Sequence, residues 1–263
     1  MTGEISLLSF DDVDDIGFAL SNGAAAEVEW PEFNARSIGP LLELYHARPE
    51  LLKQKPPWIR EGGLAPIADA RRAGVTQYVD AEASIGIFSA MDFDDELRVT
   101  DFIVRARRAA KDVGFSTHAA AKLLGAIEEL RSNILEHSQL ASSGYIAFKS
   151  SRDDFEFVVA DAGIGTLQSL KQNPAFAALE DDGRALELVL REGISRHTNQ
   201  PDRGMGFRPL FVGLANMSQS VRFRSGDHAR ELQRLGNGSI PAQTSQKPRL
   251  PGFFTYVQCS PKN

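Results

Sequence analysis

The chain has 263 residues, of which 42% are hydrophobic and 24% charged, a composition that allows a folded protein with a sizeable core. Its formal net charge of −6 disfavours a protein that binds nucleic-acid phosphates. The single cysteine, Cys259, excludes an intrachain disulfide, and no apolar run approaches the roughly 20 residues that span a bilayer. The acidic N-terminus also lacks a signal-peptide pattern, so we expect a soluble, cytoplasmic protein.

The first 90 residues predict a small α/β module. Its expected elements are strands at 5–10 and 24–30 and helices at 38–46 and 64–73. An acidic turn is expected at 11–15, and the stretch 53–63, with two adjacent prolines and two glycines, predicts a loop. The segment 78–93 predicts an extended or irregular connector, and we place a soft domain boundary there.

The second part, residues 91–263, shows clearer periodicity. Helices are expected at 97–113, 117–138 and 207–217, with a shorter helical stretch at 184–191. Strands are expected at 144–150, 155–160, 221–224 and 253–258. Ser116 or Thr117 offers an N-cap for the helix at 117–138. Together these elements predict an α+β fold.

A pair of polar residues lies on the helix predicted at 117–138. Glu129 and Asn133 are four residues apart and therefore share one face, beside an apolar stripe that would pack the helix against a sheet. An amide oxygen is a suitable hard ligand for Mg²⁺, and a carboxylate one turn away could polarise a group that attacks a phosphate. Taken alone, the same pair is typical of a solvated helix face.

A second motif, Asp161, Gly163 and Gly165, directly follows the strand predicted at 155–160. An acid at a strand end can accept a hydrogen bond from an exocyclic amine such as that of adenine. The glycines let the backbone approach a ligand closely and adopt positive φ. An ordinary turn contains the same residue types.

A third motif, Arg203, Gly204 and Gly206, precedes the apolar helix predicted at 207–217. Glycines there expose backbone N–H groups at a helix N-terminus, which favours an anion, and the arginine adds a permanent positive charge. A flexible loop ahead of a core helix is the simpler interpretation of this motif alone.

In this order and on these elements, the three motifs resemble the N, G1 and G2 boxes of the GHKL superfamily, over roughly residues 97–261. Its members include gyrase B subunits, a large heat-shock chaperone, mismatch-repair ATPases and sensor histidine kinases. The resemblance implies the Bergerat ATP-binding fold, a two-layer α/β sandwich in which helices cover a mixed, mostly antiparallel sheet. Residues 91–263 would form this domain, preceded by the small module at 1–90.

The resemblance also implies how the first two motifs bind magnesium-ATP. Asn133 would hold Mg²⁺, and Glu129 would be the candidate general base. Asp161 would bind the adenine amino group. Gly163 and Gly165 would give the backbone room beside the nucleotide.

The third motif and the last strand complete the site that the resemblance implies. Gly204 and Gly206 would close a lid, formed by the preceding loop, over the phosphates, with Arg203 as a phosphate contact. Family members usually carry Gly-Thr on the last strand, where the threonine helps to bind adenine through water. Here Phe253 takes the threonine position, and Thr255 is either its substitute or a plain packing residue.

Within the superfamily, several branches fit poorly. A sensor histidine kinase needs a phosphoacceptor histidine on a dimerising hairpin, and none of the five histidines has that setting. Gyrase-like and chaperone-like enzymes need large transducer domains. The segment 130–138 looks most like the anti-sigma-factor serine kinases and their stand-alone relatives. Three interpretations of the module at 1–90 stay open: a degenerate relative of the STAS modules that partner such kinases, a winged module, or a purely structural module.

Two functional classes stay open. The first is an enzyme that transfers the γ-phosphoryl group of ATP to a serine or threonine of a partner protein, or to water. The second is a non-catalytic module in which ATP orders the lid and so exposes or hides a partner surface. Retention of Glu129 favours the enzyme. Both classes imply ATP, Mg²⁺ and a regulatory partner protein, and homodimers are common in the family.

Overall fold

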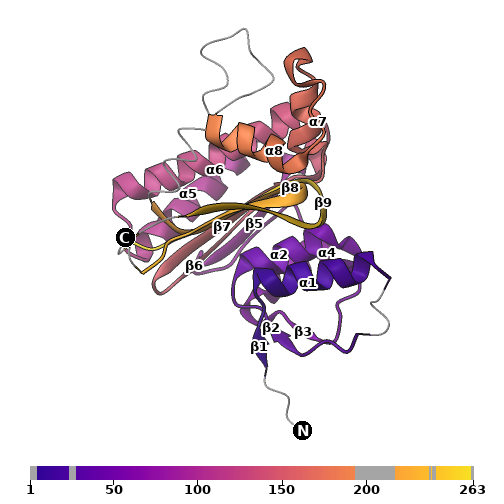
Figure 1. Cartoon of the computed structure of the whole chain (residues 1–263). Helices are drawn as coiled ribbons and strands as arrows, with labels where there is room; N and C mark the ends of the chain where they lie inside the picture. Colours follow the sequence, from indigo (N-terminus) through magenta and orange to yellow (C-terminus); the bar gives the residue numbers. More distant parts are fainter. Residues whose placement is uncertain (1–4, 24–27, 193–216, 237, 239–240, 262–263) are drawn as a thin grey trace.

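Two β-sheets and the helices packed on them make up the part of the chain that the structure, a computed structural model, describes: residues 5–23, 28–192, 217–236, 238 and 241–261. The side chains of residues 191 and 192 are outside this description. The fold is α+β, with a six-stranded antiparallel sheet and a small three-stranded parallel sheet (Figure 1).

The strands fall into two groups. The large sheet has the order β4-β5-β6-β7-β9-β8 and consists of β4 (Gln77–Val79), β5 (Ile85–Ser89), β6 (Tyr145–Ser151), β7 (Asp154–Asp161), β8 (Ser218–Gln233) and β9 (Ala242–Cys259). The small sheet consists of β1 (Ser6–Leu7), β2 (Phe33–Asn34) and β3 (Ile59–Arg60).

The helices of the described residues follow in chain order. The α-helices are α1 (Phe10–Ser21), α2 (Ile38–Ala47), α3 (Pro49–Lys53), α4 (Ala65–Arg72), α5 (Glu96–Asp112), α6 (Thr117–His137), α7 (Gly165–Lys171) and α8 (Asp182–Glu187). Single turns of 3-10 helix are η2 (Gly62–Leu64), η3 (Ala90–Asp92), η4 (Ala141–Ser143) and η5 (Pro174–Phe176), and a π-helical turn, η6 (Leu188–Glu192), extends α8.

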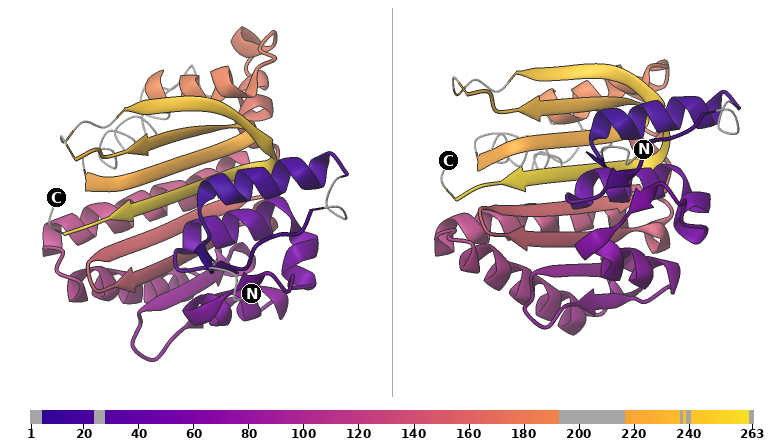
Figure 2. Two further views of the ribbon diagram at one scale, coloured as in Figure 1. Left: turned by 60° about the horizontal axis from the view of Figure 1, so that its bottom comes forward. Right: turned by 90° about the horizontal axis from the view of Figure 1, so that it is seen from below.

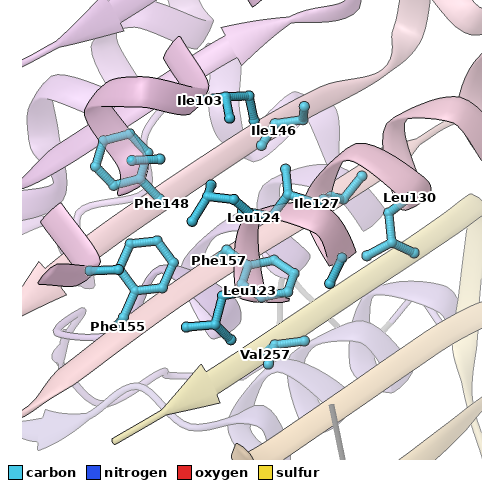
Figure 3. Packing of buried hydrophobic residues seen from close by; sticks show 14 of the residues in the cluster. Ile103, Leu123, Leu124, Ile127, Leu130, Ile146, Phe148, Phe155, Phe157 and Val257 are labelled. Carbon is cyan, nitrogen blue, oxygen red and sulfur yellow. The ribbon is translucent and has the colours of Figure 1, made fainter. Parts of the chain in front are cut away.

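One face of the large sheet is covered by α5 and α6. The Ser116 hydroxyl caps α6 by accepting a hydrogen bond from the Ala119 N–H, 3.1 Å away. The inner side of α6 then repeats apolar residues at helical spacing, and Leu123, Leu124 and Ile127 are fully buried against the strands (Figure 3). Burying each such side chain stabilises the fold by about 1.5–3 kcal/mol, so this face fixes α6 firmly to the sheet.

The opposite face of the sheet is covered by the N-terminal helices, as the view from below shows (Figure 2). Val158, Ala160 and Phe254 point to this second face and are fully or almost fully buried there by the core of the N-terminal module. Strands with two apolar faces need a covering layer on each side. The first module therefore adds a layer to the helix-on-sheet arrangement expected for residues 91–263.

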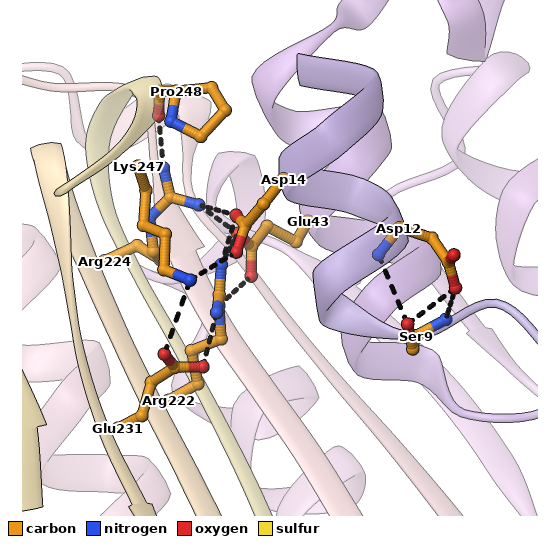
Figure 4. Close-up of polar contacts among 9 residues, drawn as sticks. All are labelled: Ser9, Asp12, Asp14, Glu43, Arg222, Arg224, Glu231, Lys247 and Pro248. Atoms are coloured by element: carbon orange, nitrogen blue, oxygen red, sulfur yellow. Dashed lines mark hydrogen bonds and ion pairs between the residues drawn. The ribbon is translucent and has the colours of Figure 1, made fainter. Parts of the chain in front are cut away.

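A buried ionic cluster holds the N-terminal helices to the sheet (Figure 4). It comprises Asp14 of α1, Glu43 of α2, Arg222, Arg224 and Glu231 of β8, and Lys247 of β9. The Arg222 guanidinium donates to Asp14 at 2.6 Å and to Glu43 at 2.8 and 2.9 Å. Charges this deeply buried require compensation, so α1, α2 and β8 are tied to one geometry.

The sequence misidentified the acidic segment at 11–15 as a turn. It belongs to α1, because Ser9 and Asp12 form a capping box in which each side chain accepts from the other residue's backbone N–H. Val13 and Ile16 then turn inward and are buried, while Asp11 and Asp15 occupy the exposed side. The helical period was hidden by the density of carboxylates.

Two expectations about strands also needed correction. The segment predicted as a connector, 78–93, contains β5 and part of β4, and these strands join the same sheet as β6 to β9. The strands predicted at 221–224 and 253–258 extend to 16 and 18 residues. The two halves of the polar stretch between them pair with each other and lengthen both strands into an antiparallel ribbon. Gly226, with φ of +60°, accommodates a register shift in that ribbon.

Candidate functional site

The polar flank of α6 holds the first two predicted residues. Glu129 and Asn133 are both half-buried and lie beside the apolar stripe that packs on the sheet. The Nδ2 atom of Asn133 is buried and has no hydrogen-bond partner in the part of the chain that the structure describes. Leaving a buried amide group unpaired costs about 1–3 kcal/mol, so a bound water or ligand group is expected there.

Asp161 ends β7 and is buried, with 4% of its surface exposed. Its carboxylate accepts a 2.8 Å hydrogen bond from the Gly163 N–H. Burial raises the pKa of the Asp161 carboxyl from 3.8 to about 6, and the hydrogen bond from Gly163 offsets part of that rise. A buried carboxylate with so little compensation destabilises the folded protein, which is typical of a residue kept for binding or catalysis.

The turn after β7 is fixed by its surroundings. The Ile164 N–H donates to the Ser138 carbonyl at 2.9 Å, just beyond the end of α6. A Cβ at Gly163 would lie 2.0 Å from that carbonyl oxygen, so only glycine fits there. Gly165 has φ of +73°, and its Cβ would lie 2.8 Å from the Ser225 hydroxyl. Both predicted glycines are therefore required by the close approach of other chain segments.

The neighbouring strand β9 places Phe253 opposite Asp161 and Thr255 opposite Val159. Directly opposed residues in an antiparallel pair point to the same side of the sheet, and here that side is the one covered by α5 and α6. Phe253 is half-buried and stacks on Phe223 with ring centroids 6.0 Å apart. The Thr255 hydroxyl is fully buried and has no hydrogen-bond partner among the described residues.

The C-terminal end of α6 and the turn after β7 therefore lie at the same end of the sheet. Ser138 follows α6 directly and contacts the turn after Asp161 through Ile164. Asn133 precedes Ser138 by five residues, which is about 8 Å along a helix. Asn133, Asp161 and Thr255 thus come from three different elements and combine one buried carboxylate with two unpaired buried polar groups.

A histidine from the N-terminal module lies behind this end of the sheet, on the second face. The ring of His46, in α2, is buried, and its Nε2 is 3.1 Å from the Pro251 carbonyl oxygen, so Nε2 carries the proton that is donated. Burial, together with the nearby Arg71, lowers the pKa of His46 to about 4, against the opposing effect of hydrogen bonds to the Pro251 and Asp161 backbone. A neutral His46 thus links α2 to the end of β7 and to the middle of β9.

The third predicted motif, Arg203, Gly204 and Gly206, lies outside the described residues, as do the lid and all but the last residue of the helix predicted at 207–217. The structure consequently describes the residues expected to contact adenine and Mg²⁺, but not the residues expected to contact the phosphates.

Two supporting residues, Ser225 and Gly252, were not predicted. The Ser225 hydroxyl accepts from the Thr166 N–H and donates to the Gly252 carbonyl, both at 2.9 Å, and so joins β8, α7 and β9. Gly252 has φ of +67°, and a Cβ there would lie 1.9 Å from the Asp161 carbonyl oxygen. The glycine before Phe253 was the only sequence signal for this contact.

Among the described residues, no cluster of three or more His, Cys, Asp or Glu side chains could hold a metal ion. Within the same residues, no helix is long and apolar enough to cross a membrane. Comparisons with protein-family models, curated proteins and solved structures gave no match.

Proposed function

We propose that the chain is a magnesium-ATP-binding protein of the GHKL type, with a Bergerat-type domain, that acts with a regulatory partner protein as a serine/threonine kinase or ATPase. The observation that supports this most is Asp161, a buried carboxylate on the sheet face that α6 covers, to which the described residues offer one hydrogen-bond donor. The antiparallel sheet with α5 and α6 on that face supports the proposal, because the resemblance implies a mostly antiparallel sheet covered by helices.

The buried polar atoms fit a nucleotide with magnesium. Asp161, ionised above pH 6, would accept a hydrogen bond from the adenine amino group. The unpaired hydroxyl of Thr255 lies on the same face, so it would supply the adenine contact for which Phe253 is unsuited. A half-turn about the last side-chain torsion of Asn133 exchanges its amide nitrogen and oxygen, so this position can present the oxygen that Mg²⁺ requires.

The residues of the chain would have separate roles in the reaction. Bound magnesium would neutralise charge on the phosphate oxygens. Glu129, one turn before Asn133 on the same flank of α6, would accept the proton from the attacking hydroxyl or water. His46 and the buried ionic cluster would keep the N-terminal helices fixed behind the site, so that a partner bound to that module could influence it.

The enzymatic role is tested by measuring phosphate release and phosphoryl transfer with Glu129→Ala. Its matched control is Glu128→Ala, since Glu128 is the adjacent, exposed carboxylate on α6. We expect Glu129→Ala to bind ATP normally and to lose turnover by about 10²–10⁴-fold, while the control retains it. Equal turnover in both variants would exclude Glu129 as the base. Wild-type binding without any turnover would favour the nucleotide-gated module.

The contact with adenine is tested by Thr255→Val, which removes the hydroxyl and keeps the shape. Since that hydroxyl is buried without a partner, the substitution should leave the free energy of unfolding unchanged or raise it. ATP affinity should nevertheless fall. A variant that loses stability but keeps its affinity would show that Thr255 is a packing residue.

A further inference from the structure

A groove lies in the N-terminal module, between α1, α3 and the segments that lead into β2 and β3. Its volume is about 710 Å³, within the range of about 300–1,000 Å³ typical of small-molecule sites. Leu20 and Leu51 contribute its aliphatic walls, with Pro56 and Pro57 at its side. Leu20 and Leu51 pack against the core that covers the second face of the sheet, so the groove is separate from the proposed nucleotide site on the α6 face.

Two tryptophans form one wall of this groove, and both are half-buried. The rings of Trp30 and Trp58 lie 5.8 Å apart at an interplanar angle of 40°. Trp58 is held from behind by Phe33, whose ring meets it edge-on with centroids 6.2 Å apart. The indole pair is therefore a preformed aromatic surface that keeps partly open to solvent.

Among the described residues that line the groove, the charged side chains are both acidic, Glu29 and Glu32. Glu32 is already neutralised, because the Arg60 guanidinium donates to both of its carboxylate oxygens. Glu29 is exposed at the same groove, and no hydrogen bond or ion pair to it exists among the described residues. One uncompensated negative charge next to two indole rings is the combination that attracts a cation with an apolar surface, through charge and cation–π attraction together.

We propose that this groove binds a small organic cation of the quaternary ammonium class, with its methyl groups against Trp30 and Trp58 and its charge near Glu29. A quaternary ammonium ion has no N–H group, so it needs no hydrogen-bond acceptor in the aromatic wall. Because its charge density is low, its desolvation requires less free energy than that of a metal ion or a primary ammonium group. The proposal does not depend on the proposed function, because the two sites share no residue.

The test uses choline chloride as the probe and intrinsic tryptophan fluorescence as the signal. The chain contains two tryptophans and both line the groove, so the signal reports on this site alone. The neutral comparison is 3,3-dimethylbutan-1-ol, which has the same shape as choline without the charge, and sodium chloride controls for ionic strength. We expect saturable binding of choline and about tenfold weaker binding of the neutral alcohol.

Three variants show which side chains of the groove bind choline. Glu29→Gln removes the charge at constant volume and should weaken choline binding about threefold to tenfold, whereas Glu50→Gln, an exposed carboxylate of α3 outside the groove, should leave it unchanged. Trp30→Leu should abolish binding, with Trp58 still present as the reporter. Thermal unfolding of each variant shows whether it is folded.

Any of three results would overturn the proposal. One is the absence of a saturable fluorescence change in the folded wild type. The second is equal binding of choline and its neutral analogue, and the third is equal effects of Glu29→Gln and Glu50→Gln; either of these would leave only an apolar groove. Asp161→Asn should bind choline as the wild type does, so failure here and failure of the nucleotide proposal are distinguishable.

Discussion

Replacing Asp161 with asparagine is expected to make the protein more stable at neutral pH, although it removes the residue proposed to bind adenine. The side chain keeps its shape, and the amide oxygen can still accept the hydrogen bond from Gly163. What disappears is the cost of holding a charged carboxylate in a buried position. Residues retained for function often reduce stability in this way.

The magnitude follows from the pKa. Burial raises the pKa of Asp161 from 3.8 to about 6, which is about 2 units, or about 3 kcal/mol when fully expressed. The pKa of Asp161 is higher in the folded than in the unfolded state. Its favourable contribution to the free energy of unfolding is therefore complete below pH 3.8 and is lost as pH rises through 6. Roughly 1.4 kcal/mol of this change falls between pH 5 and pH 7.5.

The assay is urea denaturation of wild type and Asp161→Asn at pH 5 and pH 7.5. The stability advantage of the variant should be about 1.4 kcal/mol larger at the higher pH. Asp154→Asn, at the other end of β7, makes the same chemical change away from the candidate site and serves as the control. An advantage for Asp161→Asn that is identical at both pH values would refute the assignment of a buried, weakly compensated carboxylate.

Three further tests address the surrounding structure. Gly252→Ala should cost at least about 3 kcal/mol in urea denaturation or prevent folding, because φ is +67° and the new Cβ would clash with the Asp161 carbonyl; a loss below about 1 kcal/mol would contradict this. Arg222→Met should cost about 3–5 kcal/mol, because it leaves the buried carboxylate of Glu43 with Arg224 as its remaining cation partner in the cluster. Adding Glu43→Gln should recover part of the loss, and additive losses would contradict the coupling. Cys259 is buried and its thiol pKa is raised to about 12, so a thiol reagent at pH 8 should label it only in denaturant, and rapid labelling of the native protein would show that β9 is open.

The elements that the sequence predicted well are those with strong local periodicity. The expected helix at 38–46 is confirmed as α2, the helix at 117–138 as α6 and the hairpin strands as β6 and β7. The strands that it missed depend on pairing partners: β5 pairs with β6, β4 pairs with β5, and the outer halves of β8 and β9 pair with each other. Propensity within a short window contains no information about such pairing.

In the candidate site, too, some features could be inferred from the sequence and others depend on contacts between distant segments. The resemblance of the ordered motifs to those of a known family selected Glu129, Asn133 and Asp161, and the structure shows the first two on α6 and the third at the end of β7. The bridging role of Ser225 and the need for glycine at 252 follow from the approach of β8, α7 and β9, which lie far apart in the chain. The raised pKa of Asp161 is likewise a property of the assembled core, because burial is its main cause.

The most direct test of the central claim is calorimetric titration of ATP, with and without Mg²⁺, into wild type, Asp161→Asn and Asp154→Asn at pH 7.5. The proposed function predicts magnesium-dependent binding to wild type and to Asp154→Asn, and loss of binding in Asp161→Asn while that variant is at least as stable as wild type. Absence of binding to folded wild type, or equal affinity for all three proteins, would contradict a nucleotide site built around Asp161.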